Sequence, residues 1–434
     1  MAPTSVLVLL TVMLILTLAS GMELAFGMGI VGTIGLLFWH TGWPSLVALG
    51  EISWDIGTSY SLTAVPLFIF MSAFLIETGF SEGLYTAIAK WFYRVPGGLA
   101  VASQVACSIF AAISGSSVAT AYAIGLIAIP EMKKRNYDVR LAAGSICAGG
   151  TLGILIPPSI PMIVYGSMMD VSIGKLFIAG VIPGIILTGI FILYILARVL
   201  ANPALAPLGY TNVSWRERFD ALTNVVPILG VIIVVLGSIY GGVATPTEAA
   251  ALGVTGSALI AGLYRRVNFD VIKRSMFTTV YSVGMIFPII ICALIFAHII
   301  TYLHIPQAFT QLLLGLQISR WTIFAIVCIL YIILGCFMET IAILVITIPI
   351  IGPMLVSLGF DPIWFGVILI ILIEMGLITP PVGLNLFVVQ GILDREKSFQ
   401  IVSAGSMPFV VLLAVMLLIL TLFPALVLWL PSHM

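Results

Sequence analysis

The sequence repeats itself around two short proline motifs that lie inside apolar segments. A shift that places Gly153 on Gly376 also places Pro157 and Pro158 on Pro380 and Pro381. With the same shift and no gap, three further pairs align: Asp138 with Asp361, Pro130 with Pro353, and Ser116-Ser117 with Glu339-Thr340. These residue types are uncommon within apolar helices. The register therefore predicts two related halves, residues 1–200 and 222–434, joined by a polar cytoplasmic linker at 201–221.

The apolar runs on both sides of these motifs indicate a membrane protein. Hydrophobic residues make up 61% of the 434 and charged residues 8%, whereas soluble domains carry about a quarter charged residues. The fold class expected is an all-α polytopic protein that lies in a lipid bilayer. The formal net charge is +0, so no basic surface favours nucleic acid as a partner.

Each half is predicted to hold five spanning helices and one re-entrant hairpin. The hairpins, at 98–127 and 321–350, have arms that are short for a span at about 1.5 Å per residue. The spans of the first half are placed at 4–20, 24–40, 62–80, 139–169 and 174–200. Those of the second half are placed at 222–240, 246–264, 275–303, 363–390 and 401–430, and residues 82–94 and 305–317 are predicted as interfacial helices.

An odd number of spans per half predicts that the two repeats are inverted in the membrane. With the N-terminus outside, every Lys and Arg except Lys175 and Arg320 falls on the cytoplasmic side, as the positive-inside rule requires. The loop at 131–140 is basic, and its repeat partner at 354–363 contains no Lys or Arg. Charge and repeat therefore agree on the same topology.

The prolines break one helix in each half, at 139–169 and at 363–390. A proline removes a helix donor and collides with an earlier carbonyl. The freed backbone groups are tolerated only where they are buried in protein or line a wet cavity. Inverted repeats with broken helices at matching positions are typical of the substrate and ion sites of secondary transporters. The sequence therefore predicts two ion sites, each between a hairpin tip and a broken helix.

Small residues, hydroxyls and backbone carbonyls at these positions suit a hard cation such as Na⁺. The first sodium site is predicted from Ser114, Gly115, Ser117, Gly150, Thr151 and Gly153, and the second from Gly335, Met338, Thr340, Gly376, Thr379 and Pro380. The glycines and Met338 are expected to offer main-chain carbonyls. An organic anion is expected at helix N-termini near Ser116 and Pro158 and at the Asn385 amide. No catalytic residue, cofactor or other metal is predicted.

Three carboxylates lie in or near the apolar segments. Glu339 and Glu374 are predicted to lie within the membrane, where carboxylates are costly and commonly functional. Either a functional role or a satisfied hydrogen bond between helices fits each of them. Their absence from the first half indicates that neither is the ion ligand shared by both halves. Glu248 is predicted to cap the helix that starts beside it.

Four segments carry a resemblance to a known family: SGSSVATAYAIG (114–125), GGTLGILIPPSIPMIVYG (149–166), GGVATPTEAAALG (241–253) and MGLITPPVGLNLFVVQGI (375–392). In this order they closely resemble the large permease subunit of tripartite ATP-independent periplasmic (TRAP) transporters. The resemblance covers essentially the whole chain. It implies a multi-pass protein of the bacterial inner membrane, in the ion transporter superfamily, that imports an organic acid with sodium as the coupling ion.

The resemblance also implies an elevator mechanism, in which a scaffold carries a transport domain that holds both hairpins and both broken helices. It implies two partners expected as separate chains: a small four-helix membrane subunit and a periplasmic solute-binding protein. It places sodium at the two pairs of hairpin tip and broken helix. A self-sufficient sodium/carboxylate carrier of the same superfamily, and a channel, stay open as alternatives. An intramembrane enzyme is disfavoured because the sequence lacks a nucleophile–base or metal constellation.

Overall fold

The computed structural model describes residues 3–39, 42–207, 213–305, 307–308, 318–393 and 398–434. These residues form α-helices, short 3₁₀ turns and loops, with no strand among them. The helices of the first half are α1 (Pro3–Ala19), α2 (Leu24–Trp39), α3 (Val47–Gly57), α4 (Ala64–Glu77), α5 (Phe80–Phe92), α6 (Gly98–Ser114), α7 (Ser117–Lys134), α8 (Val139–Leu155), α9 (Ile160–Met169) and α10 (Ile173–Ala201). Those that follow are α11 (Trp215–Leu222), α12 (Val226–Tyr240), α13 (Pro246–Leu263), α14 (Phe269–Tyr302), α16 (Arg320–Phe337), α17 (Thr340–Ser357), α18 (Pro362–Leu377), α19 (Leu384–Ile392), α20 (Ser398–Leu422) and α21 (Ala425–Leu428).

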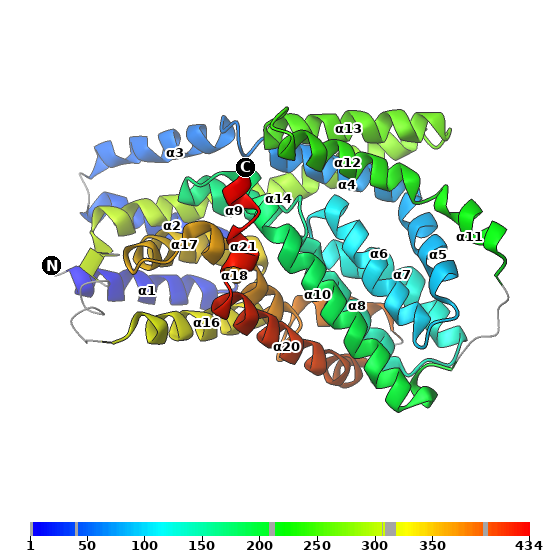
Figure 1. The fold of residues 1–434 in the computed structure, drawn as a ribbon. Helices are drawn as coiled ribbons and strands as arrows, with labels where there is room; N and C mark the ends of the chain where they lie inside the picture. Colours follow the sequence, from blue (N-terminus) through cyan, green and yellow to red (C-terminus); the bar gives the residue numbers. More distant parts are fainter. Residues whose placement is uncertain (1–2, 40–41, 208–212, 306, 309–317, 394–397) are drawn as a thin grey trace.

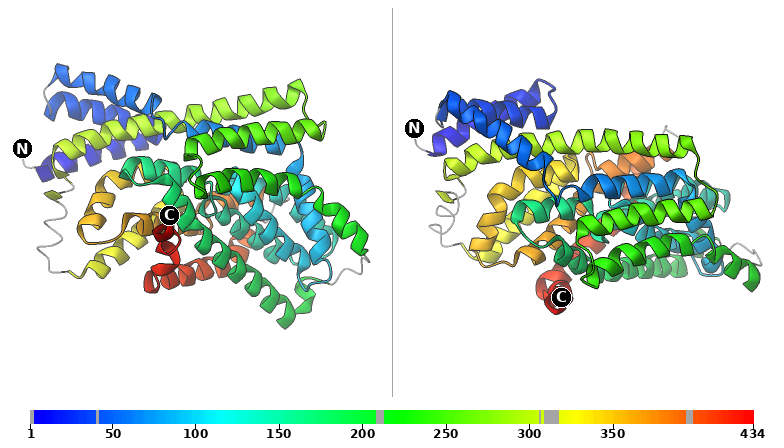
Figure 2. Two further views of the ribbon diagram at one scale, coloured as in Figure 1. Left: turned by 45° about the horizontal axis from the view of Figure 1, so that its top comes forward. Right: turned by 90° about the horizontal axis from the view of Figure 1, so that it is seen from above.

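The helices form two groups. Helices α12, α13, α4, α14, α2 and α1 pack in that order, each against the next, as a layer that runs from α12 and α13 at the upper right of Figure 1 to α2 and α1 at its left (Figures 1 and 2). The second group contains the interrupted helices, with α6, α7, α18 and α20 all packed around α8. Backbone groups in lipid must be satisfied within the segment, which is why apolar sequence of this kind folds as helices.

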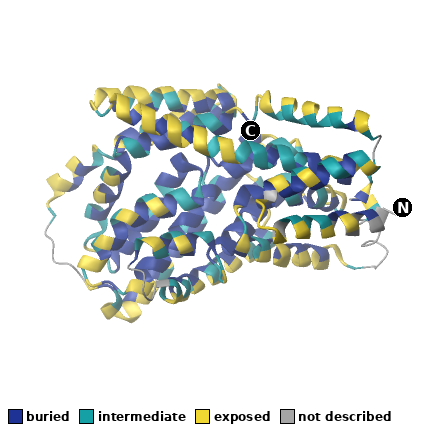
Figure 3. Cartoon of the chain, turned by 180° about the vertical axis from the view of Figure 1, so that it is seen from behind, coloured by how far each residue is buried: buried dark blue, intermediate teal, exposed yellow. Residues whose placement is uncertain are grey.

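The second group has the most deeply buried helices. Every residue from Leu141 to Leu155 in α8 and from Trp364 to Leu377 in α18 is buried. Figure 3 shows this burial through the centre of the molecule, with exposed residues on the outer helices. Small residues let α8 approach α20 closely, since a Cβ added at Gly144 would lie 2.1 Å from the Gly405 carbonyl oxygen.

The predicted helical segments agree with the structure over most of the chain. Both predicted hairpin segments and both broken segments are helix pairs separated by a short interruption. By length and composition, six of the described helices could cross a membrane, or up to eight if each bent helix pair is one span. The arms of the second hairpin, α16 and α17, are among them. The arrangement of five spans per half stays a prediction.

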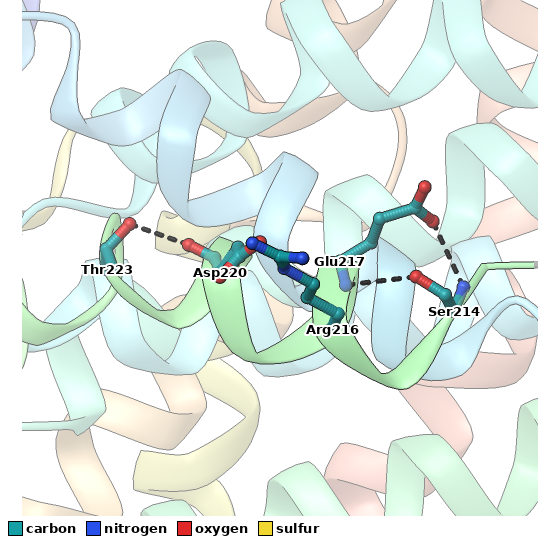
Figure 4. A network of polar contacts seen from close by, with 5 residues as sticks. All are labelled: Ser214, Arg216, Glu217, Asp220 and Thr223. Atoms are coloured by element: carbon teal, nitrogen blue, oxygen red, sulfur yellow. Dashed lines mark hydrogen bonds and ion pairs between the residues drawn. The ribbon is translucent and has the colours of Figure 1, made fainter.

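Two helices appear where sequence reasoning placed none. Helix α3 packs against α14 and exposes Trp54. Helix α11 covers the end of the predicted linker and one residue beyond it. It begins with a reciprocal capping box, in which Ser214 and Glu217 each accept a hydrogen bond from the other's backbone N–H (Figure 4). Trp91 of α5 packs edge-to-face on Trp215, which attaches this helix to α5.

Of the two segments predicted as interfacial helices, the structure describes one as a helix and leaves most of the other outside the described residues. Helix α5 matches the segment predicted at 82–94, and it follows α4 after a bend of 67°. Gly79 sits between them with φ 74°, a left-handed conformation that glycine adopts without steric cost. The other segment, predicted at 305–317, lies almost wholly outside the described residues.

The predicted cap at Glu248 is confirmed. The Glu248 carboxylate accepts hydrogen bonds from the backbone N–H of Thr245 at 2.8 Å and from its hydroxyl at 2.9 Å. Its own backbone N–H donates to Thr245 Oγ1 at 3.3 Å. Thr245 and Glu248 thus form a capping box that starts α13.

Candidate ion and substrate site

The tip of the first hairpin is a two-residue interruption between α6 and α7. Gly115 there has φ 57°, a left-handed conformation that suits glycine. Ser116 follows in an extended conformation and caps α7 by accepting a hydrogen bond from Ala119 N at 3.4 Å. A Cβ added at Gly115 would lie 2.9 Å from the carbonyl oxygen of Pro158. The hairpin tip therefore packs directly on the break in the α8–α9 helix.

The break itself follows from the chemistry of proline. The carbonyls of Gly153 and Ile154 would each accept from the residue four positions later, and these residues are Pro157 and Pro158, which have no N–H. The chain leaves the helix at Ile156 and re-enters it at α9, where Ser159 accepts a hydrogen bond from Met162 N. Main-chain carbonyl oxygens are thereby released next to the hairpin tip.

Hydroxyl groups surround this junction. Ser114 Oγ lies 2.6 Å from Thr120 Oγ1, and Thr120 donates to the Ser116 carbonyl oxygen at 2.8 Å. A Cβ added at Gly153 would lie 2.5 Å from the same carbonyl oxygen. Thr151 is buried, and its hydroxyl donates to the Ala148 carbonyl at 2.6 Å. Oxygen atoms of hydroxyls and carbonyls thus dominate this region, as a hard cation requires.

The second half has the same local construction. Helix α16 ends at Phe337, Met338 is extended, and α17 starts at Thr340. The second hairpin tip contacts the α18–α19 break, because Gly383 N donates to the Cys336 carbonyl at 2.9 Å. Helices α16 and α18 contact each other through glycines, since a Cβ added at Gly376 of α18 would lie 2.5 Å from backbone atoms of Gly335 of α16.

Pro380 and Pro381 interrupt the second broken helix. They remove the donors that the Gly376 and Leu377 carbonyls would use in a continuous helix. Thr379 closes a tighter turn, with its N–H donating to the Gly376 carbonyl at 2.9 Å. Its hydroxyl donates to the Met375 carbonyl at 2.6 Å. The Pro157–Pro158 and Pro380–Pro381 peptide bonds are both cis.

Glu339 acts as a helix cap in this structure. Its Oε2 accepts hydrogen bonds from the backbone N–H groups of Ile341 at 2.9 Å and Ala342 at 3.3 Å. A carboxylate at a helix N-terminus is also favoured by the helix dipole. These hydrogen bonds of Glu339 are thus to backbone groups of its own helix, and are not the bond between helices that the sequence left open as an alternative to a functional role.

Glu374 has a different position, in a contact between the two halves. Ser117 Oγ donates to Glu374 Oε2 at 2.8 Å, and Asn385 Nδ2 donates to Ser117 Oγ at 2.7 Å. All three side chains are buried. The Asn385 amide, predicted as a substrate contact, therefore lies at the first predicted sodium site instead of at a separate place. Sequence reasoning missed this link and the neighbouring Thr120.

The predicted ligands thus fall into two clusters. The first combines Ser114, Gly115, Ser116, Ser117, Gly150, Gly153, Pro158 and Asn385, with Thr151 buried in the same turn of α8. The second places Gly335 against Gly376, with Met338, Thr379 and Pro380 in the two adjacent interruptions and Thr340 at the start of α17. No group of three or more His, Cys, Asp or Glu that could hold a metal occurs in the described part of the chain.

A cavity of about 390 Å³ lies elsewhere in the molecule, between α3, α9, α14 and α17. Its lining includes Asp55, His298, Thr301 and Pro349. None of the predicted ligands is among its lining residues. This cavity is therefore separate from the two clusters of predicted ligands, which lie where helices pack closely together.

The arrangement of helices is similar to that of a known membrane transporter. It matches the crystal structure of the YdaH transporter from Alcanivorax borkumensis with a TM-score of 0.61, over 90% of this chain and 90% of that chain. The sequences are 15% identical. At this identity the similarity extends to the fold alone.

Sequence similarity identifies the protein family of this chain. Residues 11–426 match the family model of the tripartite ATP-independent periplasmic transporter, DctM component. The chain belongs to this family. It is 38% identical over 408 residues to the C4-dicarboxylate TRAP transporter large permease protein DctM of Pseudomonas aeruginosa, covering 93% of each chain. It is 33% identical to the isethionate TRAP transporter permease protein DctMQ of Oleidesulfovibrio alaskensis, covering 94% of this chain and 64% of that protein.

The resemblance inferred from the four motifs is therefore confirmed. This DctM-family chain is a TRAP large permease subunit and a multi-pass membrane protein. The two relatives described above are named as TRAP transporter permease proteins.

Proposed function

We propose that this chain is the permease subunit of a sodium-coupled importer that carries an organic acid anion across the bacterial inner membrane. The observation that carries the proposal is the same local construction in both halves, a hairpin tip packed on a proline-broken helix. Each junction offers carbonyl and hydroxyl oxygens to a cation. The helix N-termini that begin at Ser117 and Ile160 offer partial positive charge to a carboxylate.

The proposed substrate class is organic acids. The two relatives described above are named for C4-dicarboxylates and for isethionate, so carboxylate and sulfonate anions both occur as named substrates. Helix dipoles and backbone N–H groups recognise either anion. The subunit is proposed to act with a small membrane subunit and a periplasmic solute-binding protein.

The proposed mechanism is an elevator. The layer formed by α12, α13, α4, α14, α2 and α1 would be the scaffold, and the group around α8 and α18 would be the moving domain. Both broken helices and both hairpins belong to that second group. A rigid-body movement would then carry both ion sites and the substrate together, without dismantling either site.

Replacing Ser117 or Thr340 by alanine is expected to weaken the sodium dependence of uptake. Each substitution removes one hydroxyl ligand, so the sodium concentration for half-maximal uptake should rise about tenfold. The measurement is uptake into proteoliposomes that hold the complete transporter, as a function of external sodium. Thr255→Ala is the control, because the Thr255 hydroxyl is exposed on α13 and bonds only its own helix. Unchanged sodium dependence in both site variants contradicts the assignment.

The inverted topology makes a separate prediction. Lys134 and Ser357, both exposed, are the last residues of α7 and α17, and the repeat places these two helix ends on opposite sides of the membrane. In a background without the native cysteines, Lys134→Cys should react with an impermeant maleimide only from the cytoplasmic side. Ser357→Cys should react only from the periplasmic side. Labelling of both positions from one side excludes the inverted repeat.

A further inference from the structure

Glu374 is a buried carboxylate of the second half that contacts the hairpin tip of the first half. Its side chain is 1% exposed, and Ser117 Oγ donates to its Oε2 at 2.8 Å. Asn385 Nδ2 donates to the same Ser117 oxygen at 2.7 Å. The three groups therefore form a chain of hydrogen bonds, from the Asn385 amide through the Ser117 hydroxyl to the Glu374 carboxylate.

The second oxygen of the Glu374 carboxylate and the oxygen of the Asn385 amide accept no hydrogen bond within the described part of the chain. These two atoms, Glu374 Oε1 and Asn385 Oδ1, are both buried. A buried carboxylate without a compensating positive charge is strongly destabilising. The ion pairs described for this chain join other residues, namely Arg135 with Glu131, Arg216 with Asp220, and Arg274 with Glu77. Two unused acceptors in one cluster indicate that a cation belongs there.

We propose that Glu374 supplies the negative charge that balances a monovalent cation bound at Ser117, so that the second half completes the cation site of the first. This inference rests on the proposed sodium coupling and adds a residue to it. The ligand class is an alkali cation. Glu374 acts partly through Ser117, and it is a positioning and charge-balancing residue of the site.

The Ser117 hydroxyl links the negative charge of Glu374 to the proposed cation. A serine oxygen has one donor and two acceptor lone pairs. The proton points to Glu374 and one lone pair accepts from Asn385, so the other lone pair is left for a cation. A hydroxyl that donates to a carboxylate is polarised, which makes its oxygen a stronger cation ligand. Glu374 therefore fixes both the direction and the strength of this ligand.

Gly150 provides the space for this arrangement. A Cβ added there would lie 3.1 Å from Asn385 Nδ2 and 3.2 Å from the Ser117 carbonyl oxygen. Both distances are tighter than ordinary side-chain contacts. The absent side chain lets α8, the first hairpin and α19 meet at one point. Three segments from both halves thus converge where the cation is proposed.

The test measures sodium binding without transport. The purified full-length chain is heated in sodium chloride and in choline chloride at equal ionic strength, and the midpoint of unfolding is followed against sodium concentration. Sodium should raise this midpoint in the wild type. In Glu374→Gln, which keeps the side-chain shape and removes the charge, the half-maximal sodium concentration should rise about tenfold. Glu217→Gln is the matched control, because that carboxylate caps α11, outside both clusters of predicted ligands, and should leave the sodium response within about twofold of the wild type.

Two further variants separate a charge effect from a structural one. Glu374→Asp keeps the charge but withdraws it from Ser117, so its half-maximal sodium concentration should lie between those of the wild type and Glu374→Gln. The double variant Ser117→Ala, Glu374→Gln should bind sodium no more weakly than the worse single variant, since both act on one ligand. If Glu374→Gln does not fold, Glu374→Asp decides.

The outcomes are distinct. A wild type whose stability does not respond to sodium overturns the proposed sodium coupling itself. A wild type that responds, with Glu374→Gln or Glu374→Asp responding identically, overturns the role of Glu374 and leaves the coupling in place. Equal weakening in Glu217→Gln and Glu374→Gln also overturns it, because the effect would then come from general loss of charge.

Discussion

Replacing Gly376 by valine is expected to reduce uptake to the background of protein-free liposomes. A Cβ at Gly376 would lie 2.5 Å from the backbone of Gly335, and backbone atoms cannot rotate away as a side chain can. Overpacking of this kind costs about 1–3 kcal/mol and sometimes more. Helix α18 would have to move away from α16, which separates the second hairpin from its broken helix. Uptake by the reconstituted transporter is the measurement.

The same substitution at another glycine provides the control. Gly256 lies in α13, and a Cβ added there meets no atom within 4 Å. Gly256→Val should therefore retain most of the wild-type uptake at equal protein amount. Gly153→Val, at the repeat position in the first half, should fail as Gly376→Val does, because its Cβ would lie 2.5 Å from the Ser116 carbonyl oxygen. Wild-type uptake in Gly376→Val contradicts the close contact on which the second site depends.

Omitting either partner is expected to abolish uptake by this chain. The proposed substrate groups are helix N-termini and one amide, which hold an anion weakly compared with a paired Arg or Lys. The Asn385 amide is already engaged with Ser117. A binding protein that delivers concentrated substrate, and a small subunit that widens the scaffold, would compensate for this modest affinity. Initial uptake should fall at least about tenfold when either partner is left out.

This prediction is checked in liposomes with an inward sodium gradient. The complete mixture is compared with mixtures lacking the binding protein or the small subunit, at matched amounts of the large subunit. A complete mixture without a sodium gradient gives the baseline. Robust uptake by the large subunit alone contradicts the tripartite mechanism and favours the self-sufficient carrier of the same superfamily.

The sequence was sufficient for the features that arise from local covalent chemistry. Pro157 and Pro380 lack an N–H wherever they occur, so the helix breaks beside them follow from the sequence without knowledge of the neighbours. The capping box of Thr245 and Glu248 is equally local, because the two residues are three positions apart. The apolar runs predicted the helices around these features for the same reason.

Hydropathy was insufficient for α3 and α11. Both are short helices outside the long apolar runs, and α11 lies in a segment whose charge and prolines indicate a linker. Helix α11 is held by its packing on Trp91 of α5, a contact with a residue more than a hundred positions away. A short helix that depends on such a partner has no signal of its own in hydropathy.

The positions of the two helix breaks follow from the prolines in the sequence, whereas the groups that meet at the breaks depend on how the helices pack. Ser117 and Glu374 are separated by 257 positions, and no spacing rule links residues so far apart. Glu374 lies in a helix that is buried on all sides, so no polar face shows where its side chain points. Only the packing of α18 and α19 against the first hairpin brings this carboxylate to Ser117, and with it the contact between the two halves.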